Sequence, residues 1–418
     1  MKRIILNICF ILLFTNLINA QESEFNLFDE IKITASNPTN IERIDEFVSI
    51  NIDKLKSAKS NFNKEAFIVY VGDKEIPSQL YSDEFNCSII FVCNFKPNET
   101  KTFTIKYLEN GILRKDYKNR TYAELAMKFD ANYKDKKFNG EKFYKFSKVV
   151  VPKIHTDHDA LFKYEGPGWE SELVGYRFYL DWRNATDIFG KKVNELVLHN
   201  VGNNDVIAKD DSYHNMQDWG MDIFKVGNSI GIGSIGMMNN NKIVMVHKTD
   251  KVICEITQNG PILSEVKTNY KGWLVGENKF DLVSKFSILA GSRITKANLT
   301  VYENAKNITT GLAKHENTEF LKSNMEGDWQ YIALYGKQTL NNDNVGIVLF
   351  YKKSDLILQG EDELNYFVSL KLVNEKIEYA FAAAWELEQN GIKDKNQFEK
   401  YINEKEIKLN NPVILEIK

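Results

Sequence analysis

The sequence predicts a mostly β protein, in which a small β-sandwich precedes a large antiparallel β-sandwich. Short apolar stretches separated by turn residues recur densely from about residue 148 to the C-terminus, and runs of this kind are typical of consecutive antiparallel strands. Aromatic residues make up 12% of the chain, which favours strands. The 418 residues are enough for two to three domains.

The first element is an expected signal peptide, residues 1–20. Lys2 and Arg3 precede an apolar run that is short for a membrane span, and Ala20 is a small residue suited to cleavage. No cysteine follows directly, and no second long apolar run occurs. We therefore expect a secreted or periplasmic protein without a membrane anchor in its mature form.

Residues 25–108 are expected to form the small β-sandwich. FIVYVGDKEIPSQLY indicates two strands around a turn, and CSIIFVCNFKPNETKTFTIKY indicates two more. Residues 109–146 are charged and irregular, ending in NYKDKKFNGEKF, and are interpreted as a linker.

Residues 147–418 are expected to form the large domain. Strand patterns such as KIVMVHK, VICEITQNG and FDLVSKFSILAG follow one another, and long meanders of this size usually pack as two layers. One helix is predicted near the end. Asp394 with Gln397 forms a capping pattern, and Phe398, Tyr401 and Ile402 share one face.

Several classes of function are disfavoured. The chain has 54 basic and 57 acidic residues and no evident basic block, so no nucleic-acid partner is expected. Phosphate-binding, dinucleotide-binding and serine-hydrolase motifs are missing, so no cofactor is predicted. No metal is predicted either, because the spacing of His155 and His158 is a weak zinc signal and the Asp-rich runs do not match a calcium loop. The cysteines of the mature chain, Cys87, Cys93 and Cys254, are expected to be unpaired core residues.

The stretch GPGWESELVGYRFYLDWRN carries the strongest functional signal. On one continuous strand, one face would consist of Tyr176, Phe178, Leu180 and Trp182, and the other of Arg177, Tyr179, Asp181 and Arg183. Side chains two apart lie about 7 Å from each other, and arginine grips a carboxylate with two hydrogen bonds. The polar row would suit an acidic sugar, although a solvated ladder of salt bridges has the same pattern.

Two polar loops could complete such a site. HTDHDALFKYEGPGWE contains His158, Trp169 and Glu170, and DDSYHNMQDWGMDIFKVG contains His214 and Trp219. Imidazoles titrate near neutral pH and suit acid–base catalysis, and tryptophan can stack on sugar faces. For each tryptophan, burial in the core is the competing interpretation.

Four stretches, YEGPGWESELVGYRFYLDWRNATDIFGKK, WGMDIFKVGNSIGIG, GPILSEVKTNYKGW and TTGLAKH, resemble an uncharacterised domain-of-unknown-function family of secreted Bacteroidota proteins. The resemblance covers residues 146 to 418, and more loosely the N-terminal sandwich. It implies a galactose-mutarotase-like β-supersandwich and a link to the breakdown of uronic-acid polysaccharides. It supplies no catalytic residues, and fold alone does not determine the chemistry.

Two hypotheses follow. In the first, an exported enzyme acts on a uronic-acid-containing poly- or oligosaccharide, by lyase-type β-elimination or by epimerisation; glycoside hydrolysis by Glu165, Glu170 and Asp181 is a further alternative. In the second, a non-catalytic protein binds the glycan. The residues predicted for the lyase site are His158 or His214 as base, Tyr179 as acid, Arg177 and Arg183 as carboxylate ligands, and Asp181, Trp169, Glu170 and Trp219 as further substrate contacts.

Overall fold

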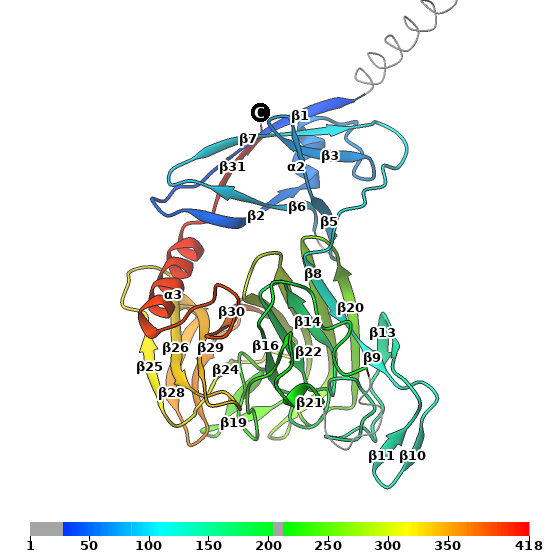
Figure 1. The fold of residues 1–418 in the computed structure, drawn as a ribbon, viewed down its shortest axis with the longest axis vertical. Helices are drawn as coiled ribbons and strands as arrows, with labels where there is room; N and C mark the ends of the chain where they lie inside the picture. The colour runs from blue at the N-terminus through cyan, green and yellow to red at the C-terminus, as the bar shows by residue number, and fades with distance from the viewer. Residues whose placement is uncertain (1–27, 85, 204–211, 418) are drawn as a thin grey trace, which may run out of the picture. The chain divides into compact units, whose positions relative to one another are not determined.

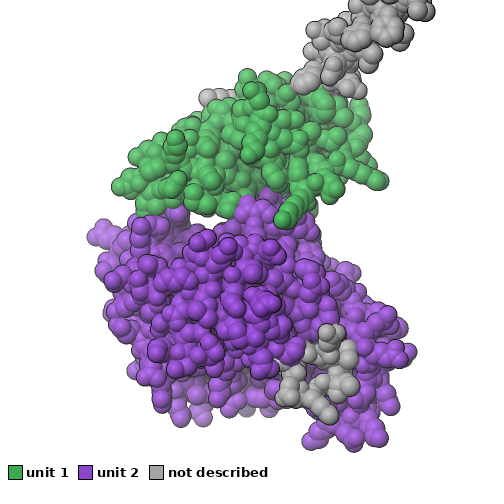
Figure 2. All heavy atoms as spheres, in the orientation of Figure 1, with its two compact units in different colours: residues 1–118, 413–418 green, residues 119–412 purple. Residues whose placement is uncertain are grey.

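A computed structural model describes residues 28–84, 86–203 and 212–417, so the expected signal peptide, residues 1–20, lies outside the described part. The predicted mostly β architecture of antiparallel sheets is confirmed. The chain divides into two compact units, residues 1–118 with 413–418 and residues 119–412 (Figure 2). Neither helix of the described segments is long and apolar enough to cross a membrane.

The small unit is a sandwich of a five-stranded and a three-stranded sheet. Its core contains Ile33, Phe91 and Phe103, and Asn51 caps the short helix by accepting backbone hydrogen bonds. The five-stranded sheet consists of β31 (Ile414–Ile417), β1 (Asp29–Ser36), β7 (Thr100–Tyr107), β3 (Phe67–Val71) and β4 (Lys74–Ile76). The other elements are β2 (Arg43–Asn51), α2 (Ile52–Ala58), β6 (Cys87–Phe95) and β5 (Ser78–Ser82).

The unit boundaries differ from the expected domains 25–108 and 147–418. The expected linker, residues 109–146, contains β8 (Thr121–Glu124), which pairs with β14 (Gly168–Ser171) inside the large unit. The C-terminal strand returns to the small unit, where Leu415 lies opposite Ala35. Both differences arise from strand pairing between segments distant in sequence, which local composition does not encode.

The large unit contains one nine-stranded and two five-stranded antiparallel sheets (Figure 1). The nine-stranded sheet runs β13 (Lys148–Val150), β20 (Lys251–Asn259), β21 (Leu263–Val275), β22 (Asn278–Leu289), β23 (Ile294–Val301), β30 (Lys376–Trp385), β27 (Asn344–Lys352), β26 (Trp329–Lys337), β25 (Thr318–Lys322). The first five-stranded sheet adds β17 (Gly220–Asp222), β16 (Thr186–Lys191) and β15 (Val174–Phe178) to β14 and β8. The second runs β19 (Lys242–Met245), β18 (Gly236–Asn239), β24 (Ile308–Ala313), β29 (Asn365–Leu370), β28 (Leu356–Glu361).

One hydrophobic core joins the nine-stranded sheet to both five-stranded sheets. Tyr176 of β15 packs edge-on against Phe381 of β30 at 5.5 Å between ring centroids. The Tyr176 hydroxyl donates to the Arg293 carbonyl and accepts from the Ala383 backbone N–H. Because this tyrosine satisfies its polar atom across the layers, the arrangement of β15 against the large sheet is specific as well as apolar.

The predicted C-terminal helix is confirmed as α3 (Lys395–Asn410), with Asp394 accepting the Gln397 N–H at its start. Phe398 and Ile402, one turn apart, pack on side chains of β26 and β27. The remaining short elements are two-stranded pairs and 3-10 turns: β9 (Ala126–Met127) with β12 (Tyr144–Lys145), β10 (Asn132–Lys134) with β11 (Lys137–Asn139), η1 (Ser212–His214) and η2 (Lys353–Asp355). Of the described cysteines, Cys254 is buried, Cys87 and Cys93 are half-buried, and all three are free thiols.

We predict that Gly233→Ala strongly destabilises the large unit. Gly233 has a φ of +64°, and a Cβ there would lie 2.1 Å from the ring of Phe381. Overpacking and backbone strain together should lower the free energy of unfolding by about 3 kcal/mol. All six tryptophans lie between residues 119 and 412, so tryptophan fluorescence during urea unfolding reports on this unit.

The matched control is Gly227→Ala, at a φ of +56° with no atom within 4 Å of the added Cβ. It should cost about 1 kcal/mol, from backbone strain alone. Equal losses for the two variants would contradict close packing at Gly233.

Candidate functional site

The candidate site is built around Arg177 on β15, on the face opposite Tyr176. The register of β15 and β16 places Asp187 directly across from Arg177. The guanidinium donates to Asp187 Oδ2 from Nε at 3.1 Å and from Nη2 at 2.9 Å. Nη2 also donates to Asp222 Oδ2 on β17 at 2.5 Å. Arg177 is 2% exposed, so the expectation that it protrudes to grip a substrate carboxylate is wrong. Its guanidinium is already paired with the carboxylates of Asp187 and Asp222.

Burial makes the charges of this cluster unusual. Desolvation, reinforced by the neighbouring Asp222, raises the pKa of Asp187 to about 6. Burial alone would lower the pKa of Arg177, but Asp222, Tyr179 and Asp187 together raise it well above its ordinary value. Two carboxylates therefore share one permanently charged guanidinium.

His214 lies beside Asp222 at the edge of this cluster. It ends the turn η1, and its Nε2 lies 3.0 Å from Asp222 Oδ2. An ionised carboxylate only accepts hydrogen bonds, so Nε2 carries the hydrogen and Nδ1 is the basic nitrogen of the neutral ring. The His214 side chain is 38% exposed whereas Asp222 is buried. A buried carboxylate that orients a partly exposed imidazole is a common arrangement for general acid–base catalysis.

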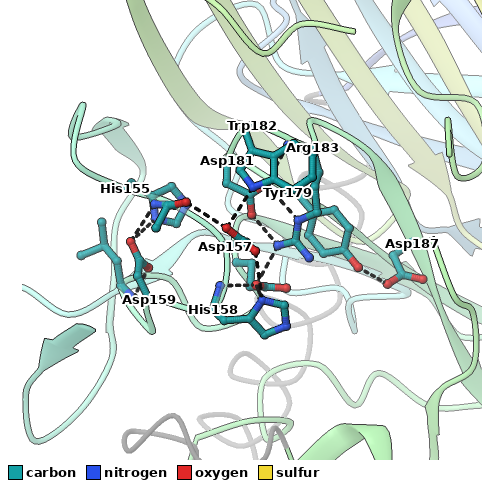
Figure 3. Close-up of polar contacts among 12 residues, drawn as sticks. His155, Asp157, His158, Asp159, Tyr179, Asp181, Trp182, Arg183 and Asp187 are labelled. Carbon is teal, nitrogen blue, oxygen red and sulfur yellow. Dashed lines mark hydrogen bonds and ion pairs between the residues drawn. The ribbon is translucent and has the colours of Figure 1, made fainter. Parts of the chain in front are cut away.

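Arg183 is the second arginine of the site. Its Nε and Nη2 donate to Asp181 at 3.0 and 2.5 Å, and Nη2 donates to Glu165 at 2.7 Å. The guanidinium lies 3.8 Å from the centroid of the Tyr179 ring, an arrangement visible in Figure 3. No hydrogen bond to Nη1 is found among the described residues, and the side chain is 11% exposed. Arg183 therefore has a donor group that can reach a bound oxygen.

Tyr179 does not have the exposure expected of a catalytic acid. It is 4% exposed, accepts a hydrogen bond from Arg177 Nη2 at 3.0 Å and donates to Asp187. Burial raises its pKa well above the ordinary value for tyrosine, so its hydroxyl stays protonated and committed to Asp187. The prediction that Tyr179 protonates a leaving group is wrong, and its ring instead supports Arg183.

The predicted strand does not continue through Arg183. β15 ends at Phe178, and the chain turns because Asp181 accepts the Arg183 backbone N–H at 2.9 Å. Trp182, expected in the core, is consequently 48% exposed and donates to Asp157 Oδ1 at 2.9 Å (Figure 3). The alternation of apolar and polar residues could not predict this contact of Trp182, because side chains alternate between two faces only while the chain is extended.

His158 lies on the exposed side of the same group. Its side chain is 65% exposed, and its Nδ1 lies 3.5 Å from Asp157 and 3.7 Å from Glu165. Its backbone N–H donates to Glu165 at 2.8 Å. Glu165 also approaches Arg177 Nη1 at 3.6 Å, so this carboxylate connects both arginines to the His158 loop. His155, in contrast, is buried and bonded to Asp159 on the other side of that loop (Figure 3).

Two of the predicted substrate contacts lie elsewhere. Trp169 is fully buried, stacks on Tyr176 and donates to Thr295, so it cannot form a subsite wall. Glu170 is fully buried in an ion pair with Lys191 at 2.8 Å and accepts two backbone N–H groups, so it cannot contact a substrate. The two side chains point to opposite faces of β14, Trp169 into the main core and Glu170 towards Lys191, and both faces are covered.

Trp219 is half-buried and packs edge-on against Phe189, behind Arg177, so its expected role in a subsite stays a prediction. Asp187, Asp222 and Trp182 belong to the observed cluster but were not among the predicted site residues. Only Asp187 had a local signal, since it lies across the β15–β16 hairpin from Arg177. Within the part of the chain that the structure describes, no group of three or more His, Cys, Asp or Glu is arranged to hold a metal ion.

We predict that Glu165→Gln destabilises the protein in a pH-dependent way. Burial alone would raise the pKa of Glu165, but Arg177 and Arg183 lower it to about 2. A lowered pKa means that the ionised group stabilises the fold above the pKa of the unfolded carboxyl, near 4.5. The variant should lose about 3 kcal/mol at neutral pH, and this loss should shrink as the pH falls towards 2. Urea unfolding at a series of pH values measures it.

The control is Glu277→Gln, an exposed glutamate in the turn after β21, which should leave stability unchanged. A loss at Glu165 that is constant across this pH range would contradict the role of its ionised form.

Comparison with known proteins gives one family and distant structural neighbours, of which two are described here. A glycosyl hydrolase family 38 protein from Enterococcus faecalis is 8% identical, with a TM-score of 0.42 over 93% of this chain. An alpha-mannosidase from Enterococcus faecalis V583 is also 8% identical, with a TM-score of 0.44 over 93% of this chain. This chain spans about half the length of each, 47% and 46%. No curated protein sequence matches. A family model described as "Domain of unknown function (DUF4861)" matches residues 35–415, and the chain belongs to that family.

Proposed function

We propose that this protein acts on uronic-acid-containing poly- or oligosaccharides by lyase-type β-elimination, with His214 as the base. The observation that carries the proposal is the pairing of His214 with the buried Asp222, 3.0 Å apart, beside the Arg177 cluster. Abstraction of a proton next to a carboxylate needs a base held in one orientation, and this pair supplies it.

The reaction assigns one proton movement to each histidine. His214 Nδ1 removes the hydrogen at C5 of the uronate, and the electron pair of that C–H bond forms the C4=C5 double bond. The bond from C4 to its oxygen breaks, and the leaving oxygen takes a proton from His158. His158 suits this role better than the buried Tyr179, because its side chain is exposed and lies within 3.7 Å of Asp157 and Glu165.

Recognition of the uronate carboxylate is assigned to Arg183. Its Nη1 faces no hydrogen-bond acceptor among the described residues, and its position over the Tyr179 ring fixes the guanidinium. Trp182 is the neighbouring exposed ring on which a sugar face can stack. Arg177 then acts as an internal counterion that keeps Asp222 in place for His214.

The proposal includes export of the protein and an acidic glycan as its partner. Its support is the leader-like composition of residues 1–20 and the resemblance of residues 146 to 418 to secreted proteins of polysaccharide-degrading bacteria. Polysaccharides of this type are extracellular, so an exported enzyme would meet them.

We predict that His214→Asn abolishes turnover and leaves the fold intact. The unsaturated product of β-elimination absorbs ultraviolet light, so the assay follows absorbance with pectate, alginate and ulvan as substrates. Loss of a positioned base should slow the reaction by about 100- to 10,000-fold.

The matched control is His199→Asn, an exposed histidine that packs edge-on against Tyr122 and should turn over normally. Deuterium exchange at C5 without an unsaturated product would show that the protein is an epimerase and not a lyase. Glycan binding without any reaction would show that the protein is a non-catalytic glycan-binding protein. Full activity of His214→Asn would refute the assignment of the base.

A further inference from the structure

Residues 128–148 differ sharply in charge from the rest of the chain. They contain seven lysines against three acidic residues, whereas the whole chain has a net charge of −3. Six aromatic residues are interleaved with the lysines: Phe129, Tyr133, Phe138, Phe143, Tyr144 and Phe146. We refer to residues 128–148 as the lysine–aromatic surface.

Three of these six rings are exposed, and two of the three pack against partly buried aromatic neighbours. Phe129, Tyr133 and Tyr144 are 73%, 37% and 42% exposed. Tyr133 packs against Phe138 at 4.8 Å between centroids, and Phe129 packs against Phe146 at 6.2 Å. Exposed rings that are fixed in this way offer apolar faces without the loss of side-chain freedom that loose rings would incur on binding.

The β10–β11 hairpin concentrates positive charge at its tip, which projects from the large unit in Figure 1. Lys134 and Lys137 lie directly opposite each other, an arrangement in which like charges repel. The two turn residues, Asp135 and Lys136, have φ values of +53° and +61°, the conformation of a tight hairpin turn. Three lysines are thus brought together at one turn, and a bound anion would relieve their repulsion.

The surface is joined to the loop that carries part of the candidate site. The Phe138 N–H donates to the Asp159 carbonyl at 2.8 Å, and the Lys128 N–H donates to the Leu161 carbonyl at 2.9 Å. The same loop carries His158 and Glu165, which is bonded to Arg183. A polymer that occupies the site can therefore continue onto residues 128–148.

We propose that the lysine–aromatic surface binds the chain of a uronic-acid polysaccharide outside the reacting sugar. Lysines pair with successive carboxylates, and the exposed rings stack on sugar faces. The polymer as ligand rests on the proposed function, but its binding can be measured without turnover. Its continuity with the His158 loop favours a polysaccharide over a membrane or a nucleic acid, because it places the surface along the path of the substrate.

The test is gel retardation of the full mature chain by polygalacturonate, with dextran as the neutral polymer. The wild type should be retarded by polygalacturonate only, and less so at high salt. Lys134→Gln/Lys136→Asn removes two charges, and asparagine tolerates the positive φ at the turn. This variant should bind at least about tenfold more weakly, which corresponds to about 1.4 kcal/mol. The control Lys242→Gln/Lys306→Gln removes two exposed lysines elsewhere in the large unit and should bind like the wild type.

The outcomes separate this inference from the proposed function. His214→Asn should bind polygalacturonate normally even though it cannot turn over. The Lys134/Lys136 variant should process a short oligouronate at the wild-type rate while its KM for polymer rises. Equal binding by the two double variants would overturn the inference, as would retention by DNA or anionic vesicles in place of polygalacturonate. Wild-type turnover of oligouronates without polymer binding would overturn it and leave the proposed function standing.

Discussion

The site depends on one buried charge arrangement, Arg177 held between Asp187 and Asp222. Three neighbouring strands, β15, β16 and β17, each contribute one of these side chains. A buried charge that loses its partner typically costs about 3 to 5 kcal/mol, so none of the three can be altered without disturbing the sheet. The same arrangement fixes Asp222, which in turn orients His214. Stability and the position of the proposed base thus have a common origin.

The two arginines differ in what surrounds them. Arg177 is enclosed by protein carboxylates and serves as an internal counterion, whereas Arg183 lies in the turn after β15, over the ring of Tyr179, and binds Asp181 and Glu165 through Nε and Nη2. The difference follows from where β15 ends. A side chain within the strand is covered by its neighbours, whereas a side chain in the turn reaches the rim of the site.

The large unit has two regions in which charged side chains of opposite sign predominate. The site contains four carboxylates, Glu165, Asp181, Asp187 and Asp222, against Arg177 and Arg183. The surface of residues 128–148 carries an excess of four positive charges. In the proposed function, that surface would attract an anionic polymer, and the acid–base chemistry would lie with the histidines of the site. Such a division lets affinity and acid–base chemistry rest on different residues.

The sequence by itself determined the mostly β architecture, the two layers and the helix capped by Asp394. These depend on local alternation, turn residues and capping, which neighbouring residues encode directly. Only the tertiary structure decided that Arg177 is buried, that Trp169 and Glu170 are interior, and that residues 119–146 belong to the large unit. It also brought Asp222 to Arg177 from 45 residues away. Burial and pairing of this kind depend on which distant strands lie side by side, and no local pattern carries that information.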